Sequence, residues 1–324
     1  MRRGPRLLAF GLAALLAASA CTGPESDEDK KDSPGAAANG DVRVAVVTHG
    51  SAGDAFWDVV KNGAEAAGKQ ENVKVTYQGD GDPAKQAQLI DAAVADKVSG
   101  LVVSMANPDA LKDSIGKAVA AGIQVVTINS GQDKSKEFGA LTHVGQSEQL
   151  AGEGAGDKFK AAGAKKLLCV IHEAGNIGLE DRCKGAKNVV GNVQNLQVDI
   201  NNLTDASARI KGKLQADASI DAVLTLNPAI AISARDAVKE GGKKVTLATF
   251  DLNGDVVKAI KDKEIIFAVD QQQYLQGYLP VVFLALYARN ANTVGGGQPV
   301  YTGPGYVTEE NADKVEKLAE AGTR

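Results

Sequence analysis

The chain opens its first regular unit with a short strand, a polar turn and a helix, between Asp41 and Gly68. Residues Val42–Val47 form a near-continuous apolar run, which is typical of a parallel strand covered on both faces. A polar turn follows at residues 49–54, and apolar residues then recur at helical spacing over Phe56–Ala67. The unit therefore predicts polar groups at the carboxyl end of a strand, where open α/β sheets bind ligands.

The alternation of strand and helix continues along the chain and constrains its fold class. The expected strands span residues 73–77, 101–105, 123–128, 167–171, 196–200, 222–226, 245–250, 265–269 and 306–307. The expected helices span residues 83–98, 107–121, 148–162, 179–191, 206–216, 229–240, 254–261, 274–289 and 309–321. Strands separated by helices of this length predict βαβ units, an α/β fold class and parallel sheets. Because the 324 residues contain two such series, we expect two similar lobes rather than one long sheet.

Residues 1–20 predict an export signal that does not belong to the fold. Three arginines precede the apolar run Leu7–Ala18, which is too short for a transmembrane helix. The end of this segment resembles a bacterial lipobox, in which Cys21 would carry a lipid and become the mature N-terminus. The alternative is ordinary cleavage near Ala20, with Cys21 incidental.

Residues 21–40 are expected to form a disordered tether, because charged residues, Pro, Gly and Ala dominate them. A lipid at Cys21 followed by such a tether predicts a globular body anchored to the cell membrane on its extracytoplasmic face. The net charge of −4 and the absence of a basic stripe argue against nucleic acid as a partner.

The other two cysteines of the chain are Cys169 and Cys183. In an exported protein such a pair predicts a disulfide rather than two free thiols. The alternative is a zinc site formed by the two cysteines with His172, but no fourth ligand stands at a familiar spacing. We therefore expect the disulfide and no bound metal.

Polar side chains recur at the ends of the predicted strands, where loops converge on a ligand. These residues are His49, Ser104, Asn129, Ser130, His172, Glu173, Asn202, Asn227, Asp251, Asp270 and Gln271. Amide and carboxylate groups of this kind satisfy hydroxyls, which both donate and accept, and an aromatic ring covers the apolar face of a sugar. Phe56 and Trp57 are the candidate aromatic residues. The alternative is that Asn and Asp merely cap helices and start turns.

Several short motifs in the same order resemble the type I periplasmic sugar-binding proteins, the ribose/galactose-type group that serves ABC transporters. These motifs are Gly53-Asp54-Ala55-Phe56-Trp57, Ala106-Asn107-Pro108-Asp109-Ala110, Thr127-Ile128-Asn129-Ser130, Val144-Gly145-Gln146, Asp181-Arg182-Cys183-Lys184-Gly185, Leu226-Asn227-Pro228, Thr249-Phe250-Asp251 and Val269-Asp270-Gln271-Gln272. The resemblance extends from about Val42 to Val307 and rests on their order and spacing.

The resemblance implies two Rossmann-like lobes with parallel sheets, joined by three crossovers near Gly145, Asp270 and Gln298. The first lobe would contain residues 41–144 and 271–297, and the second residues 145–270 and 298–324. Closure of the lobes would trap a sugar or polyol and present a composite surface to a permease. The family implies no cofactor, and we expect a monomer.

The resemblance also assigns the ligand-binding residues. Asp54, Phe56 and Trp57 would line the first lobe, together with Asn129 and Ser130, and Arg182 would reach from the second lobe with Asn227, Asp251 and Gln271. The family more often has Asp at the Asn129 position and Arg at the Ser130 position, so the residues favour no particular sugar. His49 and His172 are further candidates, and His143 is expected to be structural.

Enzymatic function is not expected from the motifs. Gly63–Lys69 matches the spacing of a phosphate loop, but Gln70 stands where Ser or Thr is required and the segment ends a helix instead of starting one. A transcriptional repressor of this fold would need a basic helix-turn-helix at the N-terminus, where this chain has its export signal. A protein with the same fold that delivers its ligand to a membrane sensor, or binds a signalling molecule, is the alternative left open.

Overall fold

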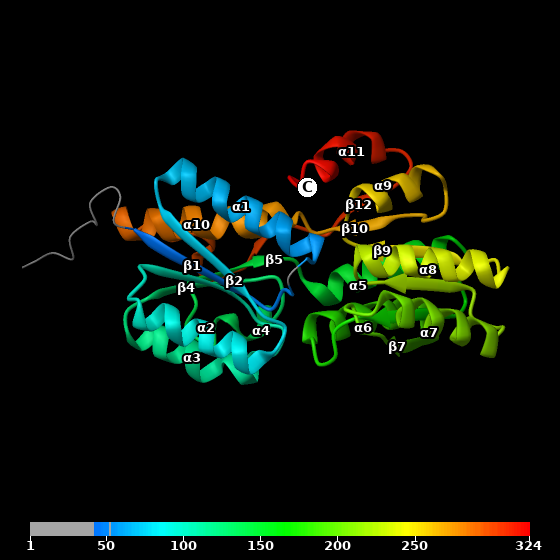
Figure 1. The fold of residues 1–324 in the computed structure, drawn as a ribbon, viewed down its shortest axis with the longest axis horizontal. Helices are drawn as coiled ribbons and strands as arrows, with labels where there is room; N and C mark the ends of the chain where they lie inside the picture. Colours follow the sequence, from blue (N-terminus) through cyan, green and yellow to red (C-terminus); the bar gives the residue numbers. More distant parts are fainter. Residues whose placement is uncertain (1–41, 52) are drawn as a thin grey trace, which may run out of the picture. The chain divides into compact units, whose positions relative to one another are not determined.

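The computed structural model describes residues 42–51 and 53–324 (Figure 1). The predicted export signal at residues 1–20, the tether at residues 21–40 and the lipidation site Cys21 lie outside the described residues. Within the described part of the chain, no helix combines the length and the apolar character needed to cross a membrane.

The described chain forms two six-stranded sheets, which confirms the expected α/β fold class. The first sheet contains, in the order of pairing, β11 (Val300–Tyr301), β5 (Thr142–Gly145), β4 (Gln124–Ile128), β3 (Gly100–Ser104), β1 (Arg43–Thr48) and β2 (Lys74–Gly79). The second contains β12 (Gly305–Val307), β10 (Ala268–Asp270), β9 (Thr246–Phe250), β8 (Ala222–Thr225), β6 (Leu167–Ile171) and β7 (Val193–Gln197). All neighbouring strands are parallel except β10 and β12, which pair in antiparallel orientation. Strands that come at the same point in each series also occupy the same position in the two sheets, so β1 corresponds to β6 and β4 to β9.

Helices cover both faces of the first sheet, as Figure 1 shows. One face packs against α1 (Ala55–Glu71) and α10 (Gln273–Asn290), and the other against α2 (Pro83–Ala95) and α3 (Pro108–Ala120). Alternate residues of β1 explain this, since Val44 and Val46 join the first core and Ala45 and Val47 join the second. A short helix, α4 (Gln132–Ser135), follows β4 and was not expected.

The second sheet is covered in the same way. One face packs against α5 (Glu148–Ala161) and α6 (Ile177–Val190). The other face packs against α7 (Leu203–Ala216), α8 (Pro228–Gly241), α9 (Gly254–Lys261) and α11 (Ala312–Glu320). Both sheets are therefore buried on two sides, which is why their strands read as apolar runs in the sequence.

Two strands lie a few residues from the expected positions. The strand expected at residues 196–200 is β7, which ends at Gln197. Val198 and Ile200 still pack against the core after the pairing has ended, and this burial extended the apolar pattern beyond the strand. The strand expected at residues 265–269 pairs only over β10, while Ile265 and Phe267 are buried ahead of it.

Three segments cross between the two sheets. The first follows β5 and leads into α5, the second follows β10 and leads into α10, and the third joins β11 to β12. The third crossing lies between Tyr301 and Gly305, because β11 pairs with β5 of the first sheet. The expected boundary at residue 298 instead placed residues 300–301 in the second lobe. The division of the chain into lobes by residue number is otherwise still a prediction.

Thr302 connects all three crossings by hydrogen bonds. Its backbone N–H donates to the carbonyl of Gly145 over 2.7 Å, and its hydroxyl donates to the carbonyl of Gln271 over 2.6 Å. The side-chain amide of Gln272 donates to the carbonyl of Thr302 in return. Thr302 is buried, so these bonds form away from bulk water and hold the three crossings together.

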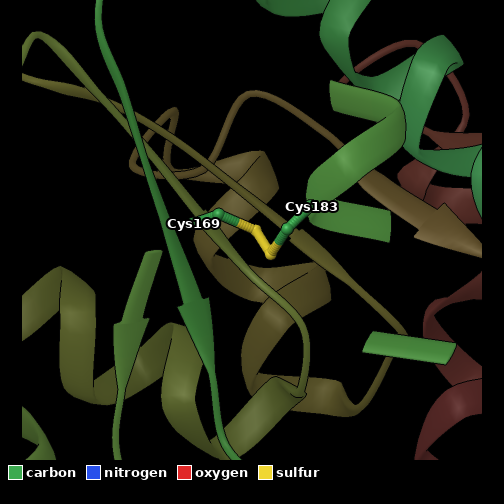
Figure 2. The surroundings of a disulfide bond; sticks show 2 residues. All are labelled: Cys169 and Cys183. Atoms are coloured by element: carbon green, nitrogen blue, oxygen red, sulfur yellow. A yellow bond between two sulfur atoms is a disulfide. The ribbon is translucent and has the colours of Figure 1, made fainter. Parts of the chain in front are cut away.

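Cys169 and Cys183 form the disulfide that the sequence predicts (Figure 2). It joins β6 to α6, with the Cα atoms 5.8 Å apart and 14 residues apart in sequence. Because each sulfur atom is bonded to the other, neither is available for the alternative zinc site. Closing a loop of this length stabilises the fold by about 3 kcal/mol in the chain-entropy model.

Candidate ligand-binding site

The predicted ligand-binding residues converge on one narrow cavity of about 20 Å³, which we call the inner cavity. It is lined by His49, Asp54, Phe56, Trp57, Asn129, His172, Glu173, Asn176, Leu179, Arg182, Leu226, Asn227, Asp251 and Gln271. Every predicted residue lies on this lining except Ser130. Glu173 and Asn176 were not among the predicted ligand-binding residues, although Glu173 was noted at a strand end.

The two lobes contribute residues from equivalent places in their sheets. His49 follows β1 and His172 follows β6, and these two strands occupy the same position in the strand order of their sheets. Asp54 and Asn176 cap the next helices, α1 and α6, with a side-chain oxygen that accepts a backbone N–H. The inner cavity is therefore formed by matching βα turns from the two lobes.

Asn129 and Asp251 form a further equivalent pair, after β4 and β9. Both have positive φ angles, 60° and 70°, in the left-handed region that Asn and Asp tolerate better than most residues. Gln271, in the second crossing, connects them: Asn129 Nδ2 donates to Gln271 Oε1 over 3.1 Å, and Gln271 Nε2 donates to Asp251 Oδ1 over 2.7 Å. A continuous chain of buried amides and a carboxyl thus runs from one lobe to the other.

Ser130 lies behind Asn129 instead of facing the cavity. Its hydroxyl lies 3.0 Å from Asn129 Oδ1 and 3.3 Å from Asn176 Oδ1, and it donates to one of them. Ser130 therefore orients the amide groups that line the cavity. Asn202, another strand-end residue, caps α7 and takes no part in the lining, so the alternative interpretation as a helix cap holds for it.

Arg182 carries the only positive charge on the lining of the inner cavity as the described residues define it. Its side chain is 3% exposed, and it forms a bidentate ion pair with Glu148, with distances of 2.6 Å from Nε to Oε2 and 2.9 Å from Nη2 to Oε1. Asp251 lies 3.8 Å away, and the guanidinium stacks 4.5 Å from the ring of Phe250. Burial alone would lower the pKa of Arg182, but Glu148 and Asp251 raise it, so the group stays charged.

Glu148 was missed by the sequence reasoning, because an acidic residue in the first turn of a helix is typical of helices in general. Its position depends on the packing of α5 against α6. A Cβ atom at Gly152 would collide with the carbonyl of Arg182, so glycine allows the two helices to approach closely. The same approach brings Glu148 and Arg182 together.

Burial brings the pKa values of two carboxyl groups of the lining, Asp54 and Asp251, close to neutrality. Burial raises the pKa of Asp251 to about 7, against the opposing effect of Arg182, and burial raises the pKa of Asp54 to about 6. Burial also lowers the pKa of His49 to about 3 and that of His172 to about 4, so both imidazoles are neutral at pH 7. The lining thus offers amides, neutral imidazoles and carboxyls that can each donate or accept.

The aromatic residues provide an apolar wall. Phe56 and Trp57 meet edge to face with ring centroids 4.9 Å apart, and His49 meets Trp57 in the same manner at 4.7 Å. Each of the three is about 5% exposed, and Phe56 and Trp57 also belong to the core of the first lobe. Trp57 therefore packs inward and lines the cavity at the same time.

His143 lies away from the inner cavity, as expected. It is buried, with Nδ1 3.0 Å from the hydroxyl of Thr127, and Nε2 has no partner among the described residues. Burial lowers its pKa from 6.5 to about 4. His143 is thus neutral in the folded protein at moderately acidic pH.

Replacing Glu148 with alanine is expected to reduce the free energy of unfolding by about 3–5 kcal/mol, because the buried guanidinium of Arg182 loses its bidentate partner and keeps only Asp251, at 3.8 Å. Glu148→Gln retains a hydrogen-bond acceptor and should cost less. Asp157→Ala, an exposed acidic residue on the same helix, is the matched control and should have little effect. Denaturant unfolding measures all three, and a Glu148→Ala variant as stable as the wild type would contradict this account.

His143 should make the protein less stable as the pH falls from 6.5 to 4, because the unfolded chain binds a proton there that the folded protein does not. At pH 5 this effect is about 2 kcal/mol. In the His143→Asn variant, which keeps an amide near Thr127, the loss of stability between pH 7 and pH 5 should be smaller by about that amount. Denaturant titrations at the two pH values test this, and equal losses in both proteins would show that His143 does not titrate in this way.

Comparisons with known proteins agree on one family. The family model described as "Periplasmic binding protein domain" matches residues 44–292. The ribose import binding protein of Bacillus subtilis is 28% identical over 234 residues, which cover 69% of this chain and 74% of that protein. The corresponding protein of Haemophilus influenzae is also 28% identical, over 238 residues that cover 70% of this chain and 79% of that one.

Solved structures give the same result. A carbohydrate transporter from Acidothermus cellulolyticus, in complex with myo-inositol, has a TM-score of 0.86 and 43% identity, covering 87% of this chain and 99% of that chain. An ABC transporter solute-binding protein from Agrobacterium vitis, with bound D-fucose, has a TM-score of 0.76 and 27% identity, covering 86% and 99%. These relatives are binding components and not enzymes. This chain belongs to the periplasmic binding protein family, within its type I sugar-binding group.

Proposed function

We propose that the chain is the extracytoplasmic solute-binding lipoprotein of an ABC importer and that it captures a neutral sugar or cyclitol in the inner cavity. The observation that carries this proposal is the chain of hydrogen-bonding groups from Asn129 through Gln271 to Asp251, which spans the two lobes. A ligand with several hydroxyls would bond to groups of both lobes at once. Because the inner cavity measures about 20 Å³ in this structure, the lobes would have to move apart to admit a ring, and binding would then favour an arrangement closed around it.

The charges of the cavity support a neutral ligand. The guanidinium of Arg182 is already paired with Glu148 and lies close to Asp251, so it offers no uncompensated charge to a phosphate or carboxylate. Its remaining N–H groups are suited to adjacent hydroxyls of a ring. Phe56 and Trp57 would cover the apolar C–H face of that ring.

The relatives indicate which compounds to test first. The Acidothermus cellulolyticus protein was solved with myo-inositol, the Agrobacterium vitis protein with D-fucose, and the Bacillus subtilis relative is a ribose import protein. Because the relative solved with myo-inositol has 43% identity, that cyclitol is the first candidate for this chain. The substitutions at Asn129 and Ser130 argue against assuming ribose.

Closure around the ligand would be carried by the three crossings that Thr302 connects. In such a mechanism the lobes move as rigid bodies and a few residues in the crossings change conformation. The closed monomer would present both lobes to a permease, with a lipid at Cys21 keeping it at the membrane surface. Delivery of the ligand to a membrane sensor would use the same cleft. Uptake measurements in cells that lack the permease would distinguish import from sensing.

At pH 8, above the pKa of about 7 of Asp251, Asp251→Asn is expected to weaken the binding of the preferred ligand by about 1.5–3 kcal/mol, because a hydrogen bond to a charged group is replaced by a neutral one. The amide can still accept from Gln271, so the fold should be retained. Asp262→Asn, at an exposed ion pair with Lys258, is the matched control. Calorimetry with myo-inositol, D-fucose, D-galactose and D-ribose tests the proposal, and if none of these neutral rings binds, the proposed function is wrong.

Lipidation at Cys21 predicts that the mature chain begins at this residue and sediments with membranes. Mass spectrometry of the N-terminal peptide should show the added mass of a diacylglyceryl group in the native host. Cys21→Ala should release the protein from the membrane fraction. A mature N-terminus with an unmodified cysteine would support ordinary cleavage instead.

A further inference from the structure

A second, larger cavity opens next to the inner cavity, and we call it the outer cavity. Its volume is about 600 Å³. Loops that follow β1, β2 and β3 of the first lobe and β6 and β7 of the second form its walls. It shares His49, His172, Glu173 and Asn176 with the inner cavity. The two cavities are therefore adjacent parts of one cleft, and a volume of this size is typical of small-molecule sites.

His172 lies at the junction of the two cavities with an unused hydrogen-bonding atom. Its side chain is 6% exposed, and Nδ1 has no partner among the described residues. Buried polar atoms of this kind are rarely left without a partner unless water or a ligand supplies one. Nδ1 is enclosed in this structure, so a ligand hydroxyl would reach it only after the surrounding loops move. Because the ring is neutral, that hydroxyl could then donate to Nδ1 or accept from it.

The charge of the outer cavity selects against anions. Asp80, Asp82, Asp199 and Glu173 lie on its walls, with Arg209 as the one basic residue among the described residues of the lining. A phosphate or carboxylate would face this excess of negative charge. Asn201 donates from Nδ2 to Asp199, and its side-chain oxygen is free among the described residues. An amide of this kind is suited to binding a hydroxyl.

The outer cavity also lacks a platform for a flat aromatic group. Its described lining contains no Phe, Tyr or Trp, in contrast to the wall formed by Phe56 and Trp57 in the inner cavity. An aromatic group would have no ring to stack on and would leave polar groups unpaired. The chemistry that remains is a neutral group rich in hydroxyls.

We propose that the outer cavity binds the second sugar unit of a glycoside whose first ring occupies the inner cavity once the lobes have moved apart to admit it. This inference rests on the proposed function and names its ligand class more narrowly, as a neutral glycoside with two rings. His172 would contact the ligand where the two rings meet. The loop after β7, with Asn201, would bond hydroxyls of the second ring.

The test compares free rings with their glycosides by calorimetry on the whole exported chain. The pairs are myo-inositol with galactinol, and D-galactose with melibiose. We expect the glycoside to bind about tenfold or more tightly than the free ring in at least one pair, a gain of about 1.4 kcal/mol. Asn201→Ala should weaken glycoside binding about fivefold while free-ring binding changes less than about twofold.

Asn195→Ala, an exposed amide on β7 outside both cavities, is the matched control and should change neither affinity. If the free rings bind and their glycosides bind equally or more weakly, the inference is wrong and the proposed function stands. An Asn201→Ala variant that keeps the full glycoside advantage would also overturn it. If neither free rings nor glycosides bind, the proposed function itself fails.

Discussion

The burial of Arg182 is the constraint on which the rest of the candidate ligand-binding site depends. A guanidinium that is 3% exposed is stable only where carboxylates lie beside it, and Glu148 meets this need with two short hydrogen bonds. Glu148 begins α5, immediately after the first crossing between the sheets, and Gln146 of that crossing donates to it. Glu148, which neutralises Arg182, is thus hydrogen-bonded to the first crossing, a segment whose conformation would change on closure.

The repetition of one βα pattern in the two lobes explains why much of the site could be predicted from the sequence. Parallel strands bring their carboxyl ends to one edge, so polar residues after each strand were expected to meet. His49, Asn129, Asn227 and Asp251 follow from this rule and line the inner cavity. The parallel pairing within the two sheets was also expected from the alternation of elements.

Other features depend on packing that a sequence pattern does not contain. Glu148 resembles any acidic residue in a first helical turn, and only the close approach of α5 and α6 places it at Arg182. The edge strand β7 was misplaced because burial continued after pairing had ended. The third crossing was expected near residue 298 but follows Tyr301. The difference arises because β11 has two residues, which is too short to give a periodic signal in the sequence. Asn202 is a polar residue at a predicted strand end, as the site residues are, but in the structure it caps α7.

Charge balance gives a physical reason for the two departures from the family pattern. The equivalent pairs across the cavity each combine one carboxyl with one amide, Asp54 with Asn176 and Asp251 with Asn129. Carboxylates facing each other in such a narrow space would repel, and burial already raises the pKa of Asp251 to about 7. Where the family more often has Asp followed by Arg, Asn129 and Ser130 remove one charge of each sign, so the net charge is unchanged. The hydroxyl of Ser130 then orients the amide by a hydrogen bond, where an arginine would have needed a buried carboxylate as its partner.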